Sequence, residues 1–349
     1  MAYKVVNCKA IKENVQRIKS KLAKNVLFCA VVKSNAYGHG VEQVVKTINP
    51  FVDYFAVANC NEVKAVRLLS QKPILVLGAL THECLSEALS LGAEFNVFKI
   101  QDIDLLISSA KKLNYDKQIN IHISINSGMN RLGVDNLNNL KKLIKNISKY
   151  KNLHIKGLFS HISDCNNKLR LSKQISIFEE FWLKELKNKG VIRHIESTSV
   201  IQSVNNYDMV RVGIGMYGYD KNFVNPVMDV YAQIVEIKNV KKGEYIGYGS
   251  NHTCKKNTKI AVLDIGYADG FLRKNSKGGK VIINNKFCDI VGEVCMSMTF
   301  VDVSNVKCKI NDKAIILGKS KDLQITANDL CKDSINYEVL TSFSTLKNI

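Results

Sequence analysis

The sequence predicts an α/β protein in which an N-terminal (β/α)8 barrel of the TIM type precedes a mostly antiparallel C-terminal β domain. Short apolar runs alternate with helix patterns, and the runs number eight, which is the number that closes such a barrel. After about residue 224 the pattern changes, because short turns then join one strand to the next. We therefore expect domains at residues 1–224 and 225–349. An open, doubly wound sheet is the structural alternative to the barrel.

The first domain opens with an amphipathic helix over residues 9–22, one face of which carries Ile11, Val15, Ile18 and Leu22. Buried strands are expected at Val26–Val32, Tyr54–Ala58, Ile74–Gly78, Phe95–Phe98, Ile119–Ile125, Ile155–Ser160, Ile192–Glu196 and Met209–Ile214. Helix patterns separate most of them, over residues 41–48, 60–70, 83–91, 101–112, 136–149 and 169–189. The connector between the last two strands has room for no more than a turn of helix.

The second domain is expected to be built mostly from strands. Their patterns lie at Asp229–Val240, Tyr245–Cys254, Lys259–Asp264, Lys280–Ile283, Phe287–Val294, Met298–Val303 and Lys313–Leu317. One helix pattern interrupts them, at Thr326–Lys332. Strands joined by short turns favour antiparallel pairing.

Composition narrows the class of protein. A hydrophobic fraction of 46% is typical of a globular chain, and no apolar run is long enough to span a membrane. The N-terminus lacks the apolar segment of a signal peptide. The ten cysteines form neither a C-x-x-C pair nor a Cys/His metal pattern, so we expect reduced thiols, no metal and a cytoplasmic location.

The net charge of +19 raises the possibility of nucleic-acid binding. Lysine and arginine together number 50, but only seven are arginine, and the lysines are scattered over nearly all of the expected helices. This distribution indicates a compositional bias and not a groove that follows phosphates. We therefore expect no nucleic-acid partner.

Candidate functional residues cluster where the expected barrel strands end. A barrel carries its chemistry at the carboxyl ends of its strands. Those ends carry Lys33, the segment 126–131 with Arg131, His161, the pair Ser197 and Thr198, and Arg211 with Gly213. Lys33 closes a buried run, where low polarity disfavours the charged amine and favours a nucleophilic one. The alternative for Lys33 is an ordinary surface lysine.

The segment V-V-K-S-N-A-Y-G-H-G, residues 31–40, resembles the cofactor-lysine motif of bacterial alanine racemases, which are fold-type III pyridoxal phosphate enzymes. The resemblance extends over nearly the whole chain. It implies that Lys33 binds pyridoxal 5'-phosphate covalently and serves as one of two acid/base groups. It also implies that Tyr37 donates a hydrogen bond to the cofactor phosphate.

Residues 121–133, I-H-I-S-I-N-S-G-M-N-R-L-G, resemble the family segment that carries the substrate-binding arginine, which matches Arg131 here. A planar guanidinium suits binding of a substrate carboxylate. Ser124 stands where many members have a lysine, often carbamylated, that braces the arginine, and Asn126 replaces a usual aspartate. Our hypothesis is that a bound anion such as chloride lies near Ser124.

Three further segments, F-S-H (159–161), R-H-I-E-S-T-S (193–199) and M-V-R-V-G-I-G-M-Y-G-Y (209–219), match the family. The resemblance implies that Arg211 faces the pyridine nitrogen, that His194 hydrogen-bonds Arg211, and that His161 lies near the second base. The phosphate would be bound by Thr198, Gly213 and Ile214. The alternative for each histidine is a buried ring with satisfied hydrogen bonds.

The second domain contributes G-Y-A-D-G (266–270) and V-G-E-V-C-M-S-M (291–298). By resemblance, Tyr267 is the second acid/base group, and the Met296 N–H binds the substrate carboxylate. In the family this pair reaches into the barrel of a partner, which implies a homodimer with shared active sites. The alternative for Tyr267 is a turn tyrosine with a packed ring. Ser297 replaces a common aspartate.

The resemblance implies pyridoxal phosphate-dependent racemisation of L-alanine to D-alanine for cell-wall peptidoglycan. A serine or broad-specificity amino-acid racemase is the nearest alternative, because Thr345 stands where a tyrosine usually crowds the substrate side chain. A non-catalytic pyridoxal phosphate-binding protein is the alternative from another class. Such proteins lack a β domain, which argues against it.

Overall fold

The computed structural model describes residues 1–198, 207–220 and 223–349, and these fold into two compact units. The barrel unit comprises Ile11–Ala36 and Val41–Val224. The β unit comprises Met1–Ala10, Tyr37–Gly40 and Asn225–Ile349. Within the described residues, no helix has the length and apolar character needed to cross a membrane.

The barrel unit is built on eight parallel strands that pair in the order β8-β7-β6-β5-β4-β3-β2-β9. The strands are β2 (Leu27–Val31), β3 (Tyr54–Val57), β4 (Ile74–Val76), β5 (Glu94–Val97), β6 (Ile119–Ser124), β7 (Leu153–Phe159), β8 (Ile192–His194) and β9 (Met209–Val212). Pairing follows chain order, whereas a doubly wound sheet reverses it, so the barrel prediction is confirmed and the open-sheet alternative is wrong.

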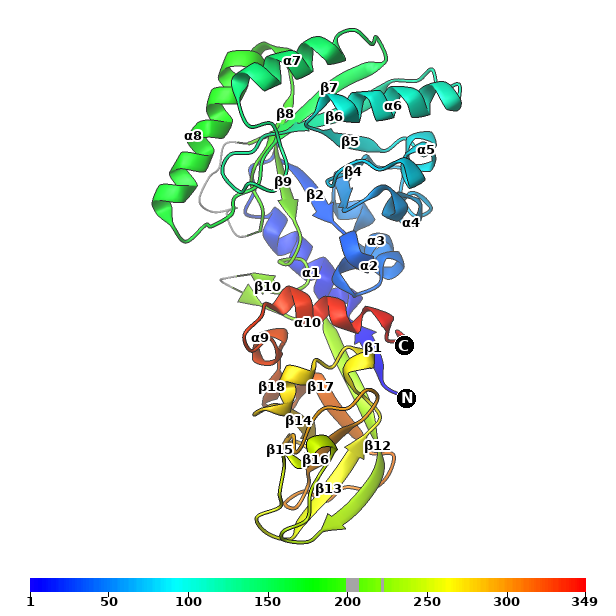
Figure 1. Cartoon of the computed structure of the whole chain (residues 1–349), viewed down its shortest axis with the longest axis vertical. Coiled ribbons are helices and arrows are strands. Elements are labelled where there is room, and N and C mark those ends of the chain that lie inside the picture. The colour runs from blue at the N-terminus through cyan, green and yellow to red at the C-terminus, as the bar shows by residue number, and fades with distance from the viewer. Residues whose placement is uncertain (199–206, 221–222) are drawn as a thin grey trace. The chain divides into compact units, whose positions relative to one another are not determined.

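The barrel is nearly closed between its first and last strands in pairing order. Between β8 and β9, Asp208 N donates to Arg193 O at 3.0 Å, and Arg211 N donates to Glu196 O at 3.1 Å. Helices surround the sheet (Figure 1). They are α1 (Cys8–Lys19), α3 (Val41–Ile48), α4 (Val63–Arg67), α5 (His82–Ser90), α6 (Ile100–Lys112), α7 (Leu137–Ile147) and α8 (Lys168–Glu185). Helices cover the outer face of the sheet, and the inner face is enclosed by the barrel. Strands such as β2 and β3 are therefore buried on both faces and appear as continuous apolar runs.

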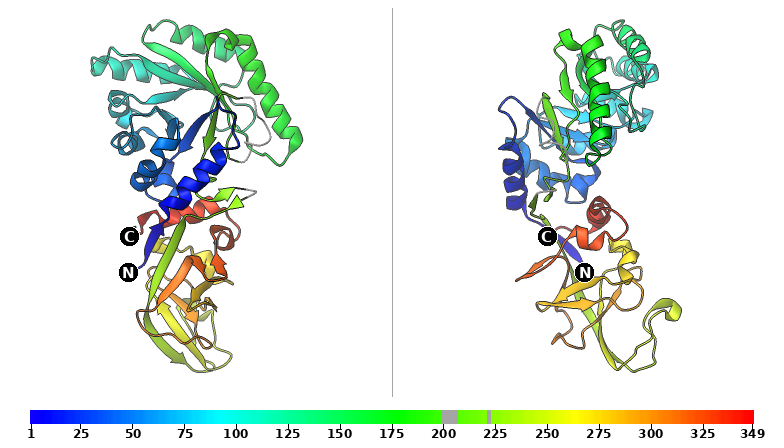
Figure 2. Two further views of the ribbon diagram at one scale, coloured as in Figure 1. Left: turned by 180° about the vertical axis from the view of Figure 1, so that it is seen from behind. Right: turned by 90° about the vertical axis from the view of Figure 1, so that its left-hand side faces the viewer.

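The β unit contains an antiparallel sheet in the order β15-β14-β17-β12-β13-β16, with β1 paired to β12 and β18 paired to β17. Its strands are β1 (Tyr3–Val6), β12 (Met228–Val240), β13 (Thr258–Leu263), β14 (Lys280–Ile283), β15 (Lys286–Asp289), β16 (Thr299–Asp302), β17 (Lys313–Ser320) and β18 (Leu323–Ile325). The long strand β12 runs beside β13 (Figure 2). The expected antiparallel β domain is therefore confirmed.

Three details of the β unit differ from the sequence prediction. The segment Tyr245–Cys254 is not a strand but a loop with a short 3-10 turn, η4 (Tyr248–Ser250), and one isolated bridge between Tyr245 and Thr253. Two of its apolar residues, Ile246 and Cys254, are buried in a small core, whereas Tyr245 and Tyr248 are exposed. Strand β15 is shorter than predicted. The expected helix is present as α9 (Ala327–Leu330), and the structure has a second helix, α10 (Asn336–Ser342), that was not expected.

Candidate active site

Lys33 lies two residues beyond β2, at the carboxyl end of the barrel strands. Its side chain is half-buried, and within the described residues its amine makes no hydrogen bond or ion pair. Burial lowers the pKa of Lys33, the charge of Arg131 lowers it further, and Glu62 opposes both effects. A lysine whose neutral form is favoured in this way can act as a nucleophile and as a base.

The chain leaves Lys33 through a left-handed turn, labelled α2 (Lys33–Tyr37). Four consecutive non-glycine residues, Ser34 to Tyr37, have φ values between 52° and 54°. Left-handed backbone costs about 1–2 kcal/mol per residue, so the surroundings must hold it. Glu62 does so by accepting Ser34 N at 2.7 Å, and the Asn35 side chain accepts Val41 N at 2.8 Å. The turn therefore fixes the direction in which Lys33 leaves its strand.

Arg131 follows β6 and is exposed. In the part of the chain that the structure describes, no carboxylate pairs with its guanidinium. A small cavity of about 40 Å³ is lined by Arg131, Ser124, Asn96 and His161, among others. Ser124 Oγ and Asn96 Oδ1 are buried there without a hydrogen-bond partner. A cavity of this size holds one water or one monatomic ion.

His161 follows β7 and is half-buried. Burial lowers the pKa of His161 to about 3, and the charges of Arg211, Arg131 and Lys33 contribute in that order. The ring is therefore neutral at physiological pH. Because three cations from three different strand ends act on it, these four side chains form one cluster at the carboxyl end of the barrel.

Arg211 lies on β9, is 5% exposed and donates hydrogen bonds to His194 and Ser160. Its Nη1 donates to His194 Nδ1 at 2.7 Å and to His194 O at 2.5 Å, and its Nη2 donates to Ser160 O at 2.6 Å. Burial lowers the pKa of Arg211 to about 10, which leaves it cationic at neutral pH. The expected contact between His194 and Arg211 is present.

Thr198 and the start of the loop after β9 form a cradle of polar groups. Thr198 Oγ1 accepts Gly213 N at 3.2 Å and Gly215 N at 3.4 Å. A Cβ on Gly215 would lie 2.5 Å from Thr198 Cγ2, so only glycine permits this close approach. The Ile214 N–H makes no hydrogen bond within the described chain. Neighbouring N–H groups beside a hydroxyl form a nest of the kind that binds phosphate.

Tyr37 is buried in the β unit, where its ring lies 5.8 Å from that of Tyr337. Burial raises its pKa, so its phenol stays protonated and remains a hydrogen-bond donor. The turn that carries it is anchored by the buried Lys4, whose Nζ donates to Gly38 O at 2.7 Å and to Phe343 O and Ser344 O at 3.0 Å.

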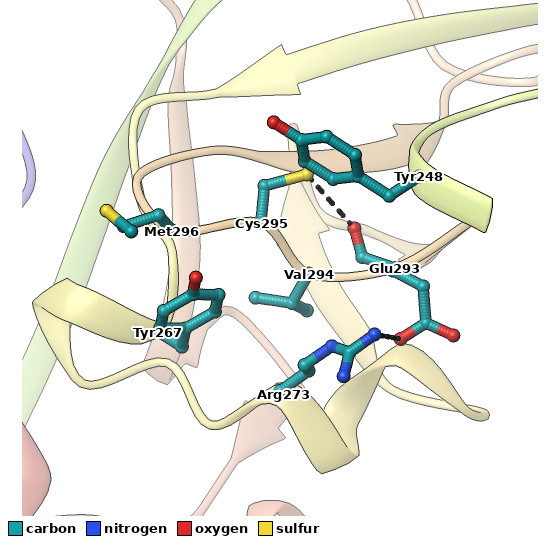
Figure 3. A pocket seen from close by; sticks show the side chains of 7 residues that line it. All are labelled: Tyr248, Tyr267, Arg273, Glu293, Val294, Cys295 and Met296. Carbon is teal, nitrogen blue, oxygen red and sulfur yellow. Dashed lines mark hydrogen bonds and ion pairs between the residues drawn. The ribbon is translucent and has the colours of Figure 1, made fainter.

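Tyr267 and Met296 line one pocket of the β unit (Figure 3). Tyr267 lies on the 3-10 turn η5 (Tyr267–Asp269), and its N–H donates to Cys295 O at 3.0 Å. The side chains of Tyr267 and Met296 are 42% and 60% exposed. Arg273 lies in the same pocket and pairs with Glu293 at 3.4 Å.

The sequence reasoning missed a second tyrosine in this pocket, Tyr248 (Figure 3). It stands on η4 between Gly247 and Gly249, whose φ values are 75° and 73°. This left-handed backbone favours glycine at both positions. Tyr248, which lies between them, is 74% exposed. The sequence signal is the motif Gly-Tyr-Gly, because glycines on both sides of a tyrosine indicate a turn and interrupt the expected strand.

The barrel and its cluster define a class of protein. A lysine of lowered pKa, a buried guanidinium and a phosphate-type nest meet at the carboxyl end of parallel strands. This arrangement is that of a barrel enzyme that works through a lysine amine and an anionic cofactor.

The family follows from sequence comparison. The model of the alanine racemase N-terminal domain matches residues 6–221, and the model of the alanine racemase C-terminal domain matches residues 227–347. The chain therefore belongs to the alanine racemase family, whose members depend on pyridoxal phosphate.

Individual relatives agree with this assignment. The chain is 35% identical to alanine racemase 2 of Caldanaerobacter subterraneus over 97% of its length and 92% of that protein. It is 31% identical to an alanine racemase of Helicobacter pylori, over 97% of this chain and 96% of that protein. The alanine racemase of Bacillus anthracis, solved with bound L-Ala-P, superposes with a TM-score of 0.90 at 29% identity, covering 98% of this chain and 92% of that one.

The residues present fit pyridoxal phosphate. Gly215 leaves room for the nest formed by Thr198, Gly213 and Ile214, and a nest of this kind takes a phosphate. The Lys33 amine is half-buried and has no hydrogen-bond partner within the described residues, as a group that forms a Schiff base requires.

Proposed function

We propose that this protein racemises L-alanine and D-alanine with pyridoxal phosphate and two acid/base groups. The observation that carries the proposal is the Lys33 amine, whose pKa is lowered by burial and by Arg131, at the carboxyl end of an alanine racemase barrel. When bound, the cofactor supplies an electron sink that makes the Cα proton of the amino acid acidic.

The barrel residues take the following roles. Lys33 holds the cofactor and exchanges a proton with Cα on one face. Thr198, Gly213 and Ile214 bind the phosphate, with Tyr37 as a further donor. Arg211 presents a permanent cation to the pyridine nitrogen of the cofactor. His161, whose own ring is neutral, lies near the cofactor ring. Arg131 binds the substrate carboxylate, for which its free fork of donors is suited.

Inversion requires a second acid/base group on the opposite face of Cα, and we propose that it is a phenol of the β unit. We assign this role to Tyr267 from its motif. Tyr248 lines the same pocket, and the two tyrosines are 42% and 74% exposed, so both are accessible to a partner subunit. The Met296 N–H would help to bind the carboxylate.

These assignments imply a homodimer with shared sites, in which residues 1–224 supply the cofactor half and residues 225–349 the second base. Exposed Tyr248 and Met296, which line one pocket of the β unit, support this proposal, because exposed apolar side chains that lie together favour a partner surface. All ten cysteines are free, which suits a cytoplasmic enzyme. Its product would supply D-alanine for peptidoglycan.

The direct test is spectroscopic and catalytic. The purified protein, supplied with pyridoxal phosphate, should show a visible absorption band that borohydride removes, and it should convert L-alanine to a racemic mixture. A protein that takes up no cofactor, or that takes it up without racemising any small amino acid, would contradict the proposal. The second outcome would instead support a non-catalytic cofactor-binding protein.

Serine is the second candidate substrate. Thr345 is exposed at the position where a larger tyrosine is usual, so this side of the site offers a longer side chain more room. Turnover of L-alanine and L-serine measured side by side separates the two readings. A Thr345→Tyr variant should lower kcat/KM for serine more than for alanine if Thr345 is what admits serine.

A further inference from the structure

Arg211 stands at one end of a buried chain of hydrogen bonds that crosses the barrel. Its Nη1 lies 2.7 Å from His194 Nδ1, and His194 Nε2 lies 2.8 Å from His122 Nδ1. His122 Nε2 in turn lies 2.9 Å from Glu94 Oε2. The four residues come from β9, β8, β6 and β5, and none of them is more than 5% exposed.

The two ends of the chain fix the direction of every hydrogen bond in it. An arginine can only donate, so His194 Nδ1 must accept and its Nε2 must carry the proton. A carboxylate can only accept, so His122 Nε2 must carry the proton and its Nδ1 must be bare. The two requirements agree at the contact between the rings, where His194 Nε2 donates to His122 Nδ1. Protonating either ring a second time breaks this pattern.

The charges along the chain agree with that assignment. Burial lowers the pKa of His122 and, with Arg211, holds the pKa of His194 well below its usual value, so both rings are neutral. Burial alone would raise the pKa of Glu94, but His122 and Lys156 outweigh it and the pKa is lowered. Glu94 is therefore ionised. Its other oxygen accepts Lys156 Nζ at 2.5 Å.

The barrel backbone makes room for this chain. Strand β7 lies between β6 and β8, and at Gly157 it carries no side chain. A Cβ at that position would lie 2.1 Å from His122 Nδ1, the atom that accepts from His194. The contact between the two rings therefore depends on a glycine in the intervening strand.

We propose that Glu94 is a positioning residue that orients Arg211 through His122 and His194. Glu94 does so because it is the fixed acceptor at the end of a hydrogen-bond chain in which every donor points the same way. The functional part of this inference rests on the role proposed for Arg211 beside the cofactor. Without an acceptor at position 94, the His122 Nε2–H is buried and unpaired. The His122 ring then reaches a lower free energy by rotating or by carrying its proton on Nδ1 in place of Nε2. Either change removes the atom that accepts the hydrogen bond from His194.

The experiment compares three variants. Glu94→Met keeps the length of the side chain but removes the acceptor, Glu94→Gln keeps one acceptor oxygen, and Lys156→Met removes the cation and leaves the His122 contact intact. Ring protons and nitrogens are read by NMR of 15N-histidine-labelled protein without cofactor. His122→Asn and His194→Asn variants identify the signals, and thermal melting checks that each variant is folded.

In the cofactor-free wild type, His122 and His194 should each show a protonated Nε2 and a bare Nδ1. Glu94→Met should shift the His122 Nε2 proton upfield and speed its exchange, whereas Glu94→Gln and Lys156→Met should retain it. In the holoenzyme, Glu94→Met should lower kcat for alanine on the order of tenfold with little change in KM, and Glu94→Gln should recover most of that loss.

Each result decides the matter. A protonated His194 Nδ1 in the wild type overturns the proposal, as does a Glu94→Met variant with unchanged ring protons and kcat. Equal losses in Glu94→Met and Glu94→Gln overturn it too, because the acceptor would then be irrelevant. If the wild type racemises no amino acid, the proposed function fails, but the NMR comparison still decides whether Glu94 fixes the chain.

Discussion

The residues proposed for the site differ between the two units. In the barrel unit most of them stand at strand ends and are buried or half-buried, with Arg131 as the exposed exception. Arg211 makes three hydrogen bonds that fix it. In the β unit, Tyr267 and Met296 stand on a turn and a loop and are 42% and 60% exposed, whereas Tyr37 is buried. The barrel residues are therefore preorganised by their own fold. Our proposal is that a partner subunit covers the exposed residues of the β unit and completes their surroundings.

The largest effect should come from the preorganised half. Lys33→Ala should lower kcat for alanine on the order of 10⁴-fold, because it removes both the covalent anchor and one acid/base group. The visible absorption band should vanish as well. Lys46→Ala, which changes an exposed lysine paired with Glu42, is the matched control and should leave both intact. A visible band that persists in Lys33→Ala would remove this residue from its proposed role.

The β half should respond to loss of a single phenol oxygen. Because Tyr267 is the proposed second base, Tyr267→Phe should lower kcat by about 10²- to 10⁴-fold, while Tyr248→Phe, in the same pocket, should have a much smaller effect. The loss should appear in turnover and not in uptake of the cofactor, because the barrel unit binds it. The reverse order of the two variants would assign the base to Tyr248, and no loss in either would exclude this pocket.

A smaller effect should come from Arg131, whose guanidinium makes no ion pair within the described residues. A bound anion near Ser124 would brace the guanidinium, since the buried Ser124 Oγ lacks a partner and the cavity has room for one ion. Replacing chloride by gluconate at constant ionic strength should lower kcat/KM by up to about fivefold. Ser124→Asp, which supplies a protein carboxylate, should abolish the chloride dependence. Identical rates with and without chloride would contradict the hypothesis.

The smallest effect concerns pH. Glu196 is buried beside Arg211, and burial raises its pKa to about 8 although Arg211 opposes the shift. The folded state therefore binds more protons than the unfolded state between pH 4.5 and about 8, so this group makes stability fall as pH rises through that window. Glu196→Gln should remove the fall. Melting temperatures of both proteins from pH 5 to 9 test this, and parallel curves would contradict it.

The sequence was more informative about the barrel than about the β unit. Strands such as β2 are buried on both faces, so they appear as apolar runs that end at a definite residue, which also located Lys33. Strand β1 is short and carries the buried Lys4, so it gave no such signal. The segment Tyr245–Cys254 was predicted to be a strand because apolar residues buried in a loop and apolar residues buried in a sheet leave similar sequence patterns.

Candidate site residues could be predicted where a single residue stands at the end of a strand. Contacts between residues of strands far apart in the sequence could not be predicted. Lys33, Arg131 and Arg211 could be located by their positions along the chain. The link from Glu94 to His122 depends on strand register and on the missing side chain at Gly157, which no local pattern reveals. Tyr248 was not singled out because its place in the pocket depends on the conformation of a turn.

Mixed dimers test most directly whether the two halves come from different subunits. Lys33→Ala should be inactive, as should Tyr248→Phe/Tyr267→Phe. If each active site joins a barrel from one subunit with a phenol from the other, unfolding and refolding the two together should restore about a quarter of wild-type activity, since half of the dimers are then hybrids with one intact site. A mixture as inactive as its components, although hybrids have formed, would contradict the account.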